Sequence, residues 1–292
     1  GNSNIVKVPS KSFIQISIIS SIIEKILKKR KYVKLKKMIT IIGYKDDNNT
    51  TKLISENCDT RIVWGGDKTI DNIRNFSLKP KANEITFSDR YSISVINTDK
   101  ITYQNNNSNL TRLIQNFYND TMIMDQNACS SPHLIFWLGK NKKKVSELFW
   151  ENLSKKINKN YDFPDIASID KYVKICSDVT MKNFKSAKIY NKSLHVVKIK
   201  NLNFKLDTLR GKWGYFYEHN IKSLNEIIPC LNPKYQTLTY FGMQKNELKD
   251  FIKDNNPRGI DRVVPIGQSL YISLDWDGYD IIKSLSRGVD II

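Results

Sequence analysis

The sequence has few of the residues that build metal sites and disulfide frameworks. Its 292 residues include only four cysteines and three histidines. The cysteines lie far apart, no Cys-x-x-Cys pair occurs, and the histidines show no ligand spacing. A zinc site is therefore not expected, and a reducing, cytoplasmic setting fits best. The residues concerned are Cys58, Cys129, Cys176 and Cys230, with His133, His195 and His219.

Long apolar runs and secretory signals are also missing. The longest apolar stretch, residues 13–27, is interrupted by Gln, Ser, Glu and Lys and is too short to span a bilayer. We predict no membrane span. The chain opens with Gly-Asn-Ser-Asn rather than methionine. We interpret it as a fragment that lacks an N-terminal portion, which can hide a signal.

The charge is strongly unbalanced, at +18 from 47 basic and 29 acidic residues. Lysines are scattered along the whole chain, and the two basic runs, at residues 28–37 and 140–144, are typical of solvated helix ends. We therefore predict no nucleic-acid partner. A basic nucleic-acid-binding protein stays open as an alternative, and its binding would weaken steeply with salt.

Short apolar strands alternate with amphipathic helices in the first quarter of the chain. This order predicts an α/β fold with a parallel sheet covered by helices. Ser10 or Ser12 is predicted to cap the first helix. We expect strands near residues 4–8, 38–43, 60–64, 84–87, 92–97, 134–138, 187–206, 215–217, 236–242 and 261–275, and helices near 12–30, 51–57, 67–76, 109–118, 144–157, 165–177 and 246–253.

Two of the early strand ends carry residues suited to phosphate. Lys7 and Ser10 follow the first strand, and Gly65 with Gly66 follows the third, each before a helix N-terminus. A helix N-terminus offers unpaired amide groups and a positive dipole end to an anion. Neither end is a Gly-x-Gly-x-x-Gly fingerprint. A tight turn without a ligand explains the glycine pair equally well.

The most suggestive stretch is DQNACSSPH, residues 125–133, followed by an apolar run. Cys129 stands in a turn of small residues between a helix and a strand, where a thiol can be exposed. We interpret it as a nucleophile that carries an acyl group. The alternative is a buried cysteine that acts as a small hydrophobe, the commoner role of free cysteines.

Five motifs in order resemble one family. They are residues 1–10, the RIVWGGD run at 61–67, the cysteine turn at 125–130, the QTLTYFG run at 236–242, and residues 259–267 together with WDGYD at 276–280. In this order they resemble the aldehyde dehydrogenase superfamily, and within it the long-chain acyl reductases that make fatty aldehyde for bacterial bioluminescence. The likeness runs over essentially the whole chain.

The resemblance implies three lobes and a two-step reaction. Residues 1–122 would complete a dinucleotide-binding lobe, 123–242 would carry the thiol, and 243–292 would return to the cofactor lobe. Cys129 would take an acyl group from acyl-CoA or from an acylated acyl-protein synthetase, within an acyl-transferase and synthetase complex. A reduced nicotinamide would then release aldehyde. The resemblance also implies a homo-oligomer, and an oxyanion site made by the Cys129 amide and an asparagine upstream of this chain.

Two departures from the family pattern refine this reading, and one histidine adds a further possibility for the thiol. The segment at residues 87–93 lacks the glutamate that activates water, and Glu84 lies too early, so reduction rather than hydrolysis is expected. Ser10 replaces a glutamate that binds ribose hydroxyls, and Lys11 adds positive charge, which together predict NADPH. Lys7, Trp64, Gly65 and Gly66 complete the expected cofactor contacts. His133 can lower the pKa of Cys129, or it is an ordinary residue at a strand start.

Two further readings stay open within the fold. One is a short-chain acylating aldehyde dehydrogenase, which differs in the chain-length dependence of its activity. The other is a catalytically inactive fragment, because fold resemblance alone does not settle function.

Overall fold

The computed structural model describes residues 2–45, 47–102, 109–203 and 205–291. Contacts divide the chain into two compact units: unit 1, Gly1–Thr86, and unit 2, Phe87–Ile292. Gly1 of the opening motif and Phe204 of the predicted 187–206 strand region lie outside the described residues. The three lobes predicted from the sequence, with boundaries at 122 and 242, stay a prediction. The division by contacts falls elsewhere.

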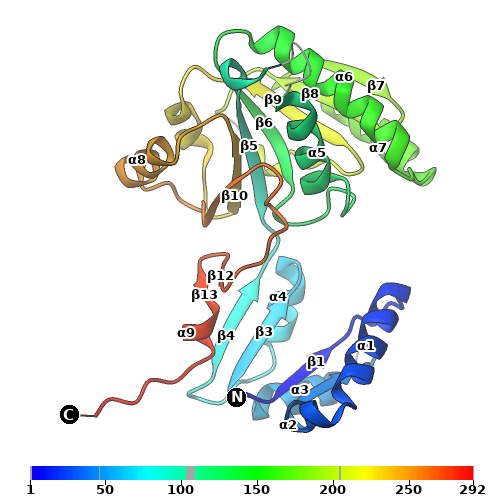
Figure 1. Ribbon diagram of the computed structural model, residues 1–292, viewed down its shortest axis with the longest axis vertical. Helices are drawn as coiled ribbons and strands as arrows, with labels where there is room; N and C mark the ends of the chain where they lie inside the picture. Colours follow the sequence, from blue (N-terminus) through cyan, green and yellow to red (C-terminus); the bar gives the residue numbers. More distant parts are fainter. Residues whose placement is uncertain (1, 46, 103–108, 204, 292) are drawn as a thin grey trace. The chain divides into compact units, whose positions relative to one another are not determined.

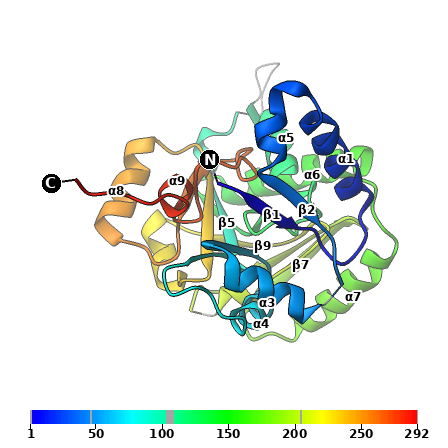
Figure 2. The same ribbon diagram turned by 90° about the horizontal axis from the view of Figure 1, so that it is seen from below.

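Unit 1 begins with a parallel strand pair. β1 (Asn4–Lys7) pairs in parallel with β2 (Ile39–Ile42), and Figure 2 shows the two strands side by side. The connection between them contains α1 (Ile14–Leu27), the 3-10 turn η1 (Arg30–Tyr32) and α2 (Val33–Lys36). This is the strand–helix–strand order that the apolar pattern predicts.

The predicted serine cap of the first helix is wrong. α1 starts four residues after Ser10, with Phe13 in extended conformation at its N-cap and no side-chain cap. The Ser10 hydroxyl instead donates to the carbonyl of Tyr44, 3.4 Å away. A serine caps a helix only when the first turn follows it directly, and here neither Ser10 nor Ser12 is at that position.

The rest of unit 1 is a second strand pair with two helices. β3 (Thr60–Trp64) pairs with β4 (Asn83–Phe87), whose last residue opens unit 2. α3 (Asn48–Asn57) precedes β3, and α4 (Asp67–Arg74) follows it. Asp47 caps α3 by accepting a hydrogen bond from the Asn49 amide at 3.0 Å.

Unit 2 is built on a seven-stranded sheet in the order β11-β10-β5-β6-β9-β8-β7 (Figure 1). Every neighbouring pair is parallel except β7 and β8, which form an antiparallel edge. The strands are β5 (Tyr91–Asn97), β6 (Pro132–Leu138), β7 (Phe184–Asn191), β8 (Leu194–Ile199), β9 (Tyr215–Asn220), β10 (Tyr235–Phe241) and β11 (Arg262–Pro265).

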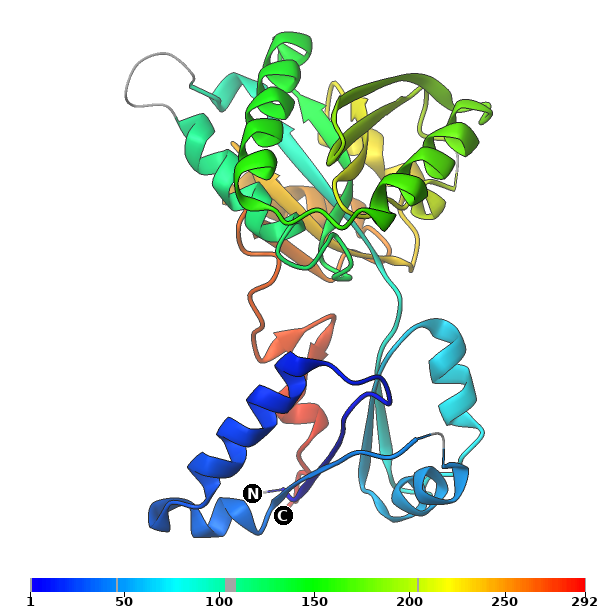
Figure 3. The ribbon, with the colours of Figure 1, turned by 90° about the vertical axis from the view of Figure 1, so that its right-hand side faces the viewer.

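Helices cover both faces of this sheet. One face carries α5 (Asn109–Thr121) and α6 (Lys142–Asn160), drawn in green in Figure 3. The other carries α7 (Ile166–Val179), α8 (Lys245–Asn255) and the 3-10 segments η3 (Leu206–Thr208) and η4 (Leu224–Cys230). Successive residues of a strand point to opposite faces. Ile135 therefore packs in the α5–α6 layer, while Leu134 and Phe136 pack in the other.

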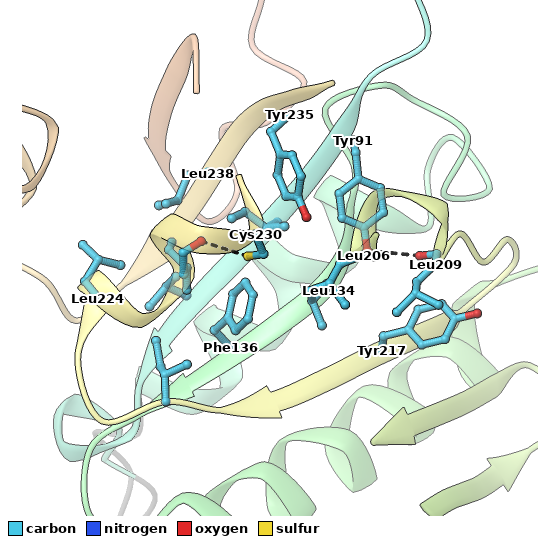
Figure 4. Close-up of a cluster of buried hydrophobic side chains, with 14 of the residues drawn as sticks. Tyr91, Leu134, Phe136, Leu206, Leu209, Tyr217, Leu224, Cys230, Tyr235 and Leu238 are labelled. Carbon is cyan, nitrogen blue, oxygen red and sulfur yellow. Dashed lines mark hydrogen bonds between the residues drawn. The ribbon is translucent and has the colours of Figure 1, made fainter. Parts of the chain in front are cut away.

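The core on the sheet face that carries α7 and α8 contains Cys230, one of the four cysteines (Figure 4). Its side chain is 7% exposed, and its thiol donates to the carbonyl of Ile227 at 2.9 Å. Burial raises the pKa of Cys230 to about 11. A thiol in this state is a core residue rather than a nucleophile.

The chain ends with a small hairpin. β12 (Asp275–Trp276) pairs antiparallel with β13 (Tyr279–Asp280), and the short helix α9 (Ile281–Ser284) follows. No described helix is long and apolar enough to cross a membrane.

Candidate active site

The cysteine turn is held by a buried glutamine. Gln126 is fully buried, with φ +60° after Asp125 at φ +53°. Its side chain donates to the carbonyl of Tyr215 at 3.0 Å and accepts from the amides of Gly214 at 3.2 Å and Tyr215 at 3.1 Å. Two consecutive left-handed residues that are not glycine cost roughly 1–2 kcal/mol each. The hydrogen bonds of Gln126 to the start of β9 offset that cost.

The backbone of Cys129 is tied to the sheet itself. The Ser92 hydroxyl, on β5, donates to the carbonyl of Cys129 at 2.6 Å and accepts from the amide of Thr237 on β10 at 3.3 Å. The Ser131 amide closes the turn on the carbonyl of Ala128 at 2.9 Å. Cys129 therefore sits in a fixed position at the amino end of β6, beside the amino ends of β5 and β10.

The thiol of Cys129 is half-buried, and its pKa is raised. Burial is the largest cause, and the negative charge of Asp277 adds to it. The Gln236 side chain and the backbone amides of Ser130 and Cys129 act in the opposite direction. Backbone amides that favour a negative sulfur are the kind of donor that an oxyanion needs. The predicted donor role of the Cys129 amide is compatible with this geometry.

Two buried polar side chains lie beside the thiol. Gln236 is fully buried, and neither atom of its amide group has a hydrogen-bond partner among the described residues. Asp277 is 7% exposed, with φ +50°, and its Oδ1 likewise has no partner there. Burial raises the pKa of Asp277 to about 6, against the opposing charge of Arg262. The site thus combines a thiol with a carboxyl group that changes charge near neutral pH.

Arg262 and Asp120 hold the segment that carries Asp277. Arg262 lies 4.0 Å from the centre of the Trp276 ring and donates to the carbonyls of Ser269 and Tyr271, both at 3.0 Å. Asp120, from α5 and 1% exposed, accepts from the amides of Gly267 at 2.6 Å and Ser269 at 3.0 Å. Burial raises the pKa of Asp120 despite these hydrogen bonds.

His133, the second residue of β6, lies in a buried aromatic environment. It is 4% exposed and stacks on Tyr91, with ring centres 5.4 Å apart, and its Nδ1 has no hydrogen-bond partner among the described residues. Burial, followed by the charge of Arg210, lowers the pKa of His133 to about 3. A neutral imidazole supplies no positive charge. The structure offers no support for the idea that His133 lowers the pKa of Cys129.

Glu84 is occupied in unit 1 by two arginines. Its carboxylate pairs with Arg61 at 2.5 Å and with Arg74 at 2.7 Å. Burial raises the pKa of Glu84, but hydrogen bonds from Arg74 and Arg61 outweigh it, and the net result is a lowered pKa. A carboxylate clamped in this way is a poor base for water, which agrees with the predicted lack of a water-activating glutamate.

The predicted cofactor residues of the first strand gather around two aromatic rings. The Lys7 ammonium lies 4.8 Å from the centre of the Tyr44 ring, and Ser10 donates to the Tyr44 carbonyl. Lys11 lies 5.5 Å from the centre of the Phe13 ring. Lys7, Ser10 and Lys11 are all exposed. Both ammonium groups are therefore accessible to an anion.

The glycine turn follows β3 directly. Gly66 is the N-cap of α4 and has no side-chain cap, so its helix start is left open. A Cβ at Gly66 would meet nothing within 4 Å, whereas one at Gly65 would approach the Thr69 side chain at 3.1 Å. Trp64 is 60% exposed. A helix start with bare backbone can bind an anion, so the predicted contacts of Gly65, Gly66 and Lys7 with a dinucleotide are compatible with this geometry and stay a prediction.

Sequence reasoning missed most of the polar residues around the thiol. Gln236 and Asp277 fall within motifs that carry the family resemblance, but nothing local marks them as site residues. Asp120 did leave a signal. It lies on the apolar face of α5 with Leu113 and Phe117, where an unpaired carboxylate would be costly. Among the described residues, no group of three or more His, Cys, Asp or Glu side chains is arranged to hold a metal ion.

Structural comparison relates the chain to aldehyde dehydrogenases. A putative methylmalonate-semialdehyde dehydrogenase from Sinorhizobium meliloti 1021, complexed with NAD, is 11% identical with a TM-score of 0.63, covering 98% of this chain and 63% of that one. A lactaldehyde dehydrogenase is 10% identical with a TM-score of 0.60, covering 91% and 56%. Proline utilization A from Bdellovibrio bacteriovorus is 13% identical with a TM-score of 0.62, covering 91% and 29%.

This chain therefore spans between 29% and 63% of the length of those proteins. At such identities the likeness concerns the fold, and it confirms the predicted aldehyde dehydrogenase-like α/β class. No curated protein sequence gives a significant match. A model of the family described as acyl-CoA reductase (LuxC) matches residues 1–288. Because that match covers nearly the whole chain, the protein belongs to the LuxC acyl-CoA reductase family.

Proposed function

We propose that this chain reduces a long-chain acyl thioester to a fatty aldehyde with NADPH, through an acyl group carried on Cys129. One observation carries the proposal most directly: the half-buried thiol of Cys129 is fixed in a turn with the amides of Cys129 and Ser130 beside it. Membership of the acyl-CoA reductase family supports the reaction class.

The acylation step follows from the surroundings of the thiol. A thiolate attacks the acyl carbonyl, and negative charge develops on the carbonyl oxygen. The amides of Cys129 and Ser130, which favour a negative sulfur, would stabilise that charge. Because burial raises the pKa of the Cys129 thiol, little thiolate exists before the substrate binds. The nucleophile is thus protected from unrelated electrophiles and needs a base at the moment of attack.

The cofactor belongs to unit 1 in this proposal. A bound reduced nicotinamide supplies the hydride that converts the acyl carbonyl to an aldehyde. Lys7 and Ser10 would hold its ribose, and Gly65 and Gly66 its pyrophosphate. Ser10 brings no negative charge and Lys11 brings a positive one, so a 2′-phosphate is favoured and NADPH is preferred over NADH.

Water must be kept from the acyl group, because hydrolysis would release fatty acid instead of aldehyde. Two carboxylates lie near the position of the family's water-activating glutamate, and both are paired: Glu84 with Arg61 and Arg74, and Asp89 with Arg210. The acyl donor in this proposal is acyl-CoA or an acylated acyl-protein synthetase, met within a complex that also contains an acyl transferase. The aldehyde would serve bioluminescence, and the enzyme would work as a homo-oligomer.

The experiment that tests the proposal is acylation with radiolabelled tetradecanoyl-CoA in the absence of cofactor. Label is expected to enter the wild type as a hydroxylamine-sensitive thioester and to leave as aldehyde when NADPH is added. Cys129→Ser is expected to lose the thioester. Cys176→Ser is the matched control, because Cys176 is exposed and free, and it should label like the wild type.

Unchanged thioester labelling of Cys129→Ser would rule the assignment out. The rate of acylation with a series of acyl-CoA chain lengths distinguishes a long-chain acyl reductase from a short-chain acylating aldehyde dehydrogenase. Faster acylation by short chains would favour the short-chain enzyme. Acylation followed by release of fatty acid alone would contradict reduction.

A further inference from the structure

Two buried polar groups beside Cys129 have no role in the acylation step as described so far. Gln236 is fully buried with both amide atoms unpartnered among the described residues, and Asp277 is 7% exposed with Oδ1 unpartnered there. Each unmade hydrogen bond of a buried group costs roughly 1–3 kcal/mol. Groups left in this state at one place point to a ligand or a chemical role.

Their positions are fixed by backbone rather than by their own side chains. Gln236 lies in β10, and its carbonyl accepts from the amide of Asp261 at 2.9 Å. Asp277 lies in the turn between β12 and β13, in left-handed conformation at φ +50°, followed by Gly278 at φ +80°. The backbone therefore holds both side chains beside the thiol, and their polar atoms make no hydrogen bond that supports the fold among the described residues.

The Gln236 amide connects the other two groups. It opposes the burial that raises the pKa of the Cys129 thiol and of the Asp277 carboxyl, although neither group lies within hydrogen-bonding distance of it. The negative charge of Asp277 in turn raises the pKa of the thiol.

The backbone places the three groups together as well. The Ser92 hydroxyl joins the Cys129 carbonyl to the amide of Thr237, next to Gln236. The Asp261 amide donates to the Gln236 carbonyl, and a Cβ at Gly278, next to Asp277, would lie 3.1 Å from the Asp261 carboxylate. The thiol, the amide and the carboxyl therefore form one cluster within unit 2.

Charged groups from two segments of unit 2 act on Asp277. After burial, which raises its pKa, the strongest influence is Arg262 on β11, which lowers it. Asp261, next to that strand, raises the pKa, and Arg90, just before β5, lowers it. The outcome is a carboxyl group that titrates at about 6, close to the pH at which an acid–base group works best in the cell.

On the basis of the proposed acylation of Cys129, we infer that Asp277 carries a proton from the Cys129 thiol to the thiol that leaves the acyl donor. Gln236 orients the Asp277 carboxyl group for this transfer. The proton moves first from Cys129 Sγ to the Asp277 carboxylate. The thiolate forms a bond to the acyl carbon, and the bond from that carbon to the donor sulfur breaks. The leaving thiolate takes the proton from Asp277. The products are acyl-Cys129 and donor thiol, and nothing is oxidised or reduced.

This role makes two reactions of Cys129 respond in opposite directions to one substitution. Asp277→Asn removes a negative charge, so the pKa of the thiol falls and its alkylation by iodoacetamide becomes faster. Iodide leaves without a proton, so the alkylation needs no acid. Acyl transfer from tetradecanoyl-CoA loses its proton carrier and is expected to slow about 100-fold.

The experiment measures both rates from pH 5 to 9 in the wild type, Asp277→Asn and Asp277→Glu. Alkylation is followed on the peptide that contains Cys129 by mass spectrometry. The fold of each variant is checked separately, by circular dichroism and by the midpoint of its urea unfolding curve. Asp275→Asn is the matched control, since Asp275 is exposed on β12. We expect faster alkylation but slower acyl transfer in Asp277→Asn, recovery of transfer in Asp277→Glu, and wild-type rates in the control.

Acyl transfer at the wild-type rate in Asp277→Asn overturns the inference while leaving acylation of Cys129 intact. Faster alkylation and slower transfer in an Asp277→Asn variant that has lost its wild-type circular dichroism or has a lowered urea midpoint mean that Asp277 only supports the fold, and this outcome also overturns the inference. So does an Asp277→Glu variant that transfers no faster than Asp277→Asn. If wild-type Cys129 takes no acyl group at all, the proposed function fails together with the role of Asp277.

Discussion

Gln126 is the residue on which the position of the nucleophile depends most. It is fully buried three residues before Cys129, and its side chain makes hydrogen bonds only to backbone. A Gln126→Leu substitution keeps the volume of the side chain and removes its polar atoms. The amides of Gly214 and Tyr215 would then lose their acceptor.

The magnitude can be worked from these contacts. Two buried N–H groups without an acceptor cost roughly 1–3 kcal/mol each. The carbonyl of Tyr215 loses a donor as well, although it can accept from elsewhere. We therefore expect Gln126→Leu to lower the free energy of unfolding by about 4 kcal/mol. The turn at residues 125–130 should also loosen, because its two left-handed residues lose the side-chain contacts of Gln126 and keep other hydrogen bonds, such as that of the Gln126 amide to the Thr121 carbonyl.

The assay is equilibrium unfolding in urea, followed by the fluorescence of the buried Trp137 and Trp150, together with the alkylation rate of Cys129. Gln268→Leu is the control, since Gln268 is exposed and its substitution should change stability by less than about 0.5 kcal/mol. A loss below about 1 kcal/mol in Gln126→Leu, with unchanged alkylation, would refute the reasoning that Gln126 fixes the turn.

Three further predictions concern charge. The pKa of Asp277 is raised by folding, from 3.8 to about 6, so the folded state binds the proton more tightly. The free energy of unfolding should fall by up to about 3 kcal/mol as pH rises from about 4 to about 6, and then level off. In urea titrations at a series of pH values, Asp277→Asn should abolish this pH dependence. An unchanged pH dependence in the variant contradicts the assignment to Asp277. Ser10→Glu should shift the preference from NADPH toward NADH, measured as the ratio of the two kcat/KM values, and an unchanged ratio counts against the role of Ser10. Glu84→Gln should destabilise unit 1 by about 2 kcal/mol, because Arg61 loses the carboxylate with which it pairs. The ratio of aldehyde to fatty acid among the products should stay unchanged. A changed ratio would mean that Glu84 activates water.

Local pattern predicted most of the fold. β3 was expected at residues 60–64 and lies there, and the helix expected from residue 109 is α5. These elements carry their own signal, since apolar residues recur at the period of a strand or a helix. The predicted serine cap of α1 was wrong because a serine caps a helix only if the first helical turn begins directly after it. Here residues 9–12 stay outside the helix.

The candidate site was predictable only in part, for a physical reason. Cys129 stands out because its turn is short and chemically unusual. Gln236 and Asp277 join it only after β10 and the β12–β13 turn have folded, more than 100 residues along the chain. A buried polar residue without partners is recognised by its surroundings, and the sequence alone does not contain them. His133 shows the converse, since nearness in sequence suggested a role that its stacking on Tyr91 does not support.

The most direct test of the account is a single turnover at Cys129. The chain is loaded with tetradecanoyl-CoA, digested and examined by mass spectrometry, before and after one equivalent of NADPH. The account predicts one tetradecanoyl group on the peptide that contains Cys129, and its loss in step with the appearance of an equal amount of tetradecanal. An acyl group on any other residue, or aldehyde formed at the wild-type rate by Cys129→Ser, would contradict it.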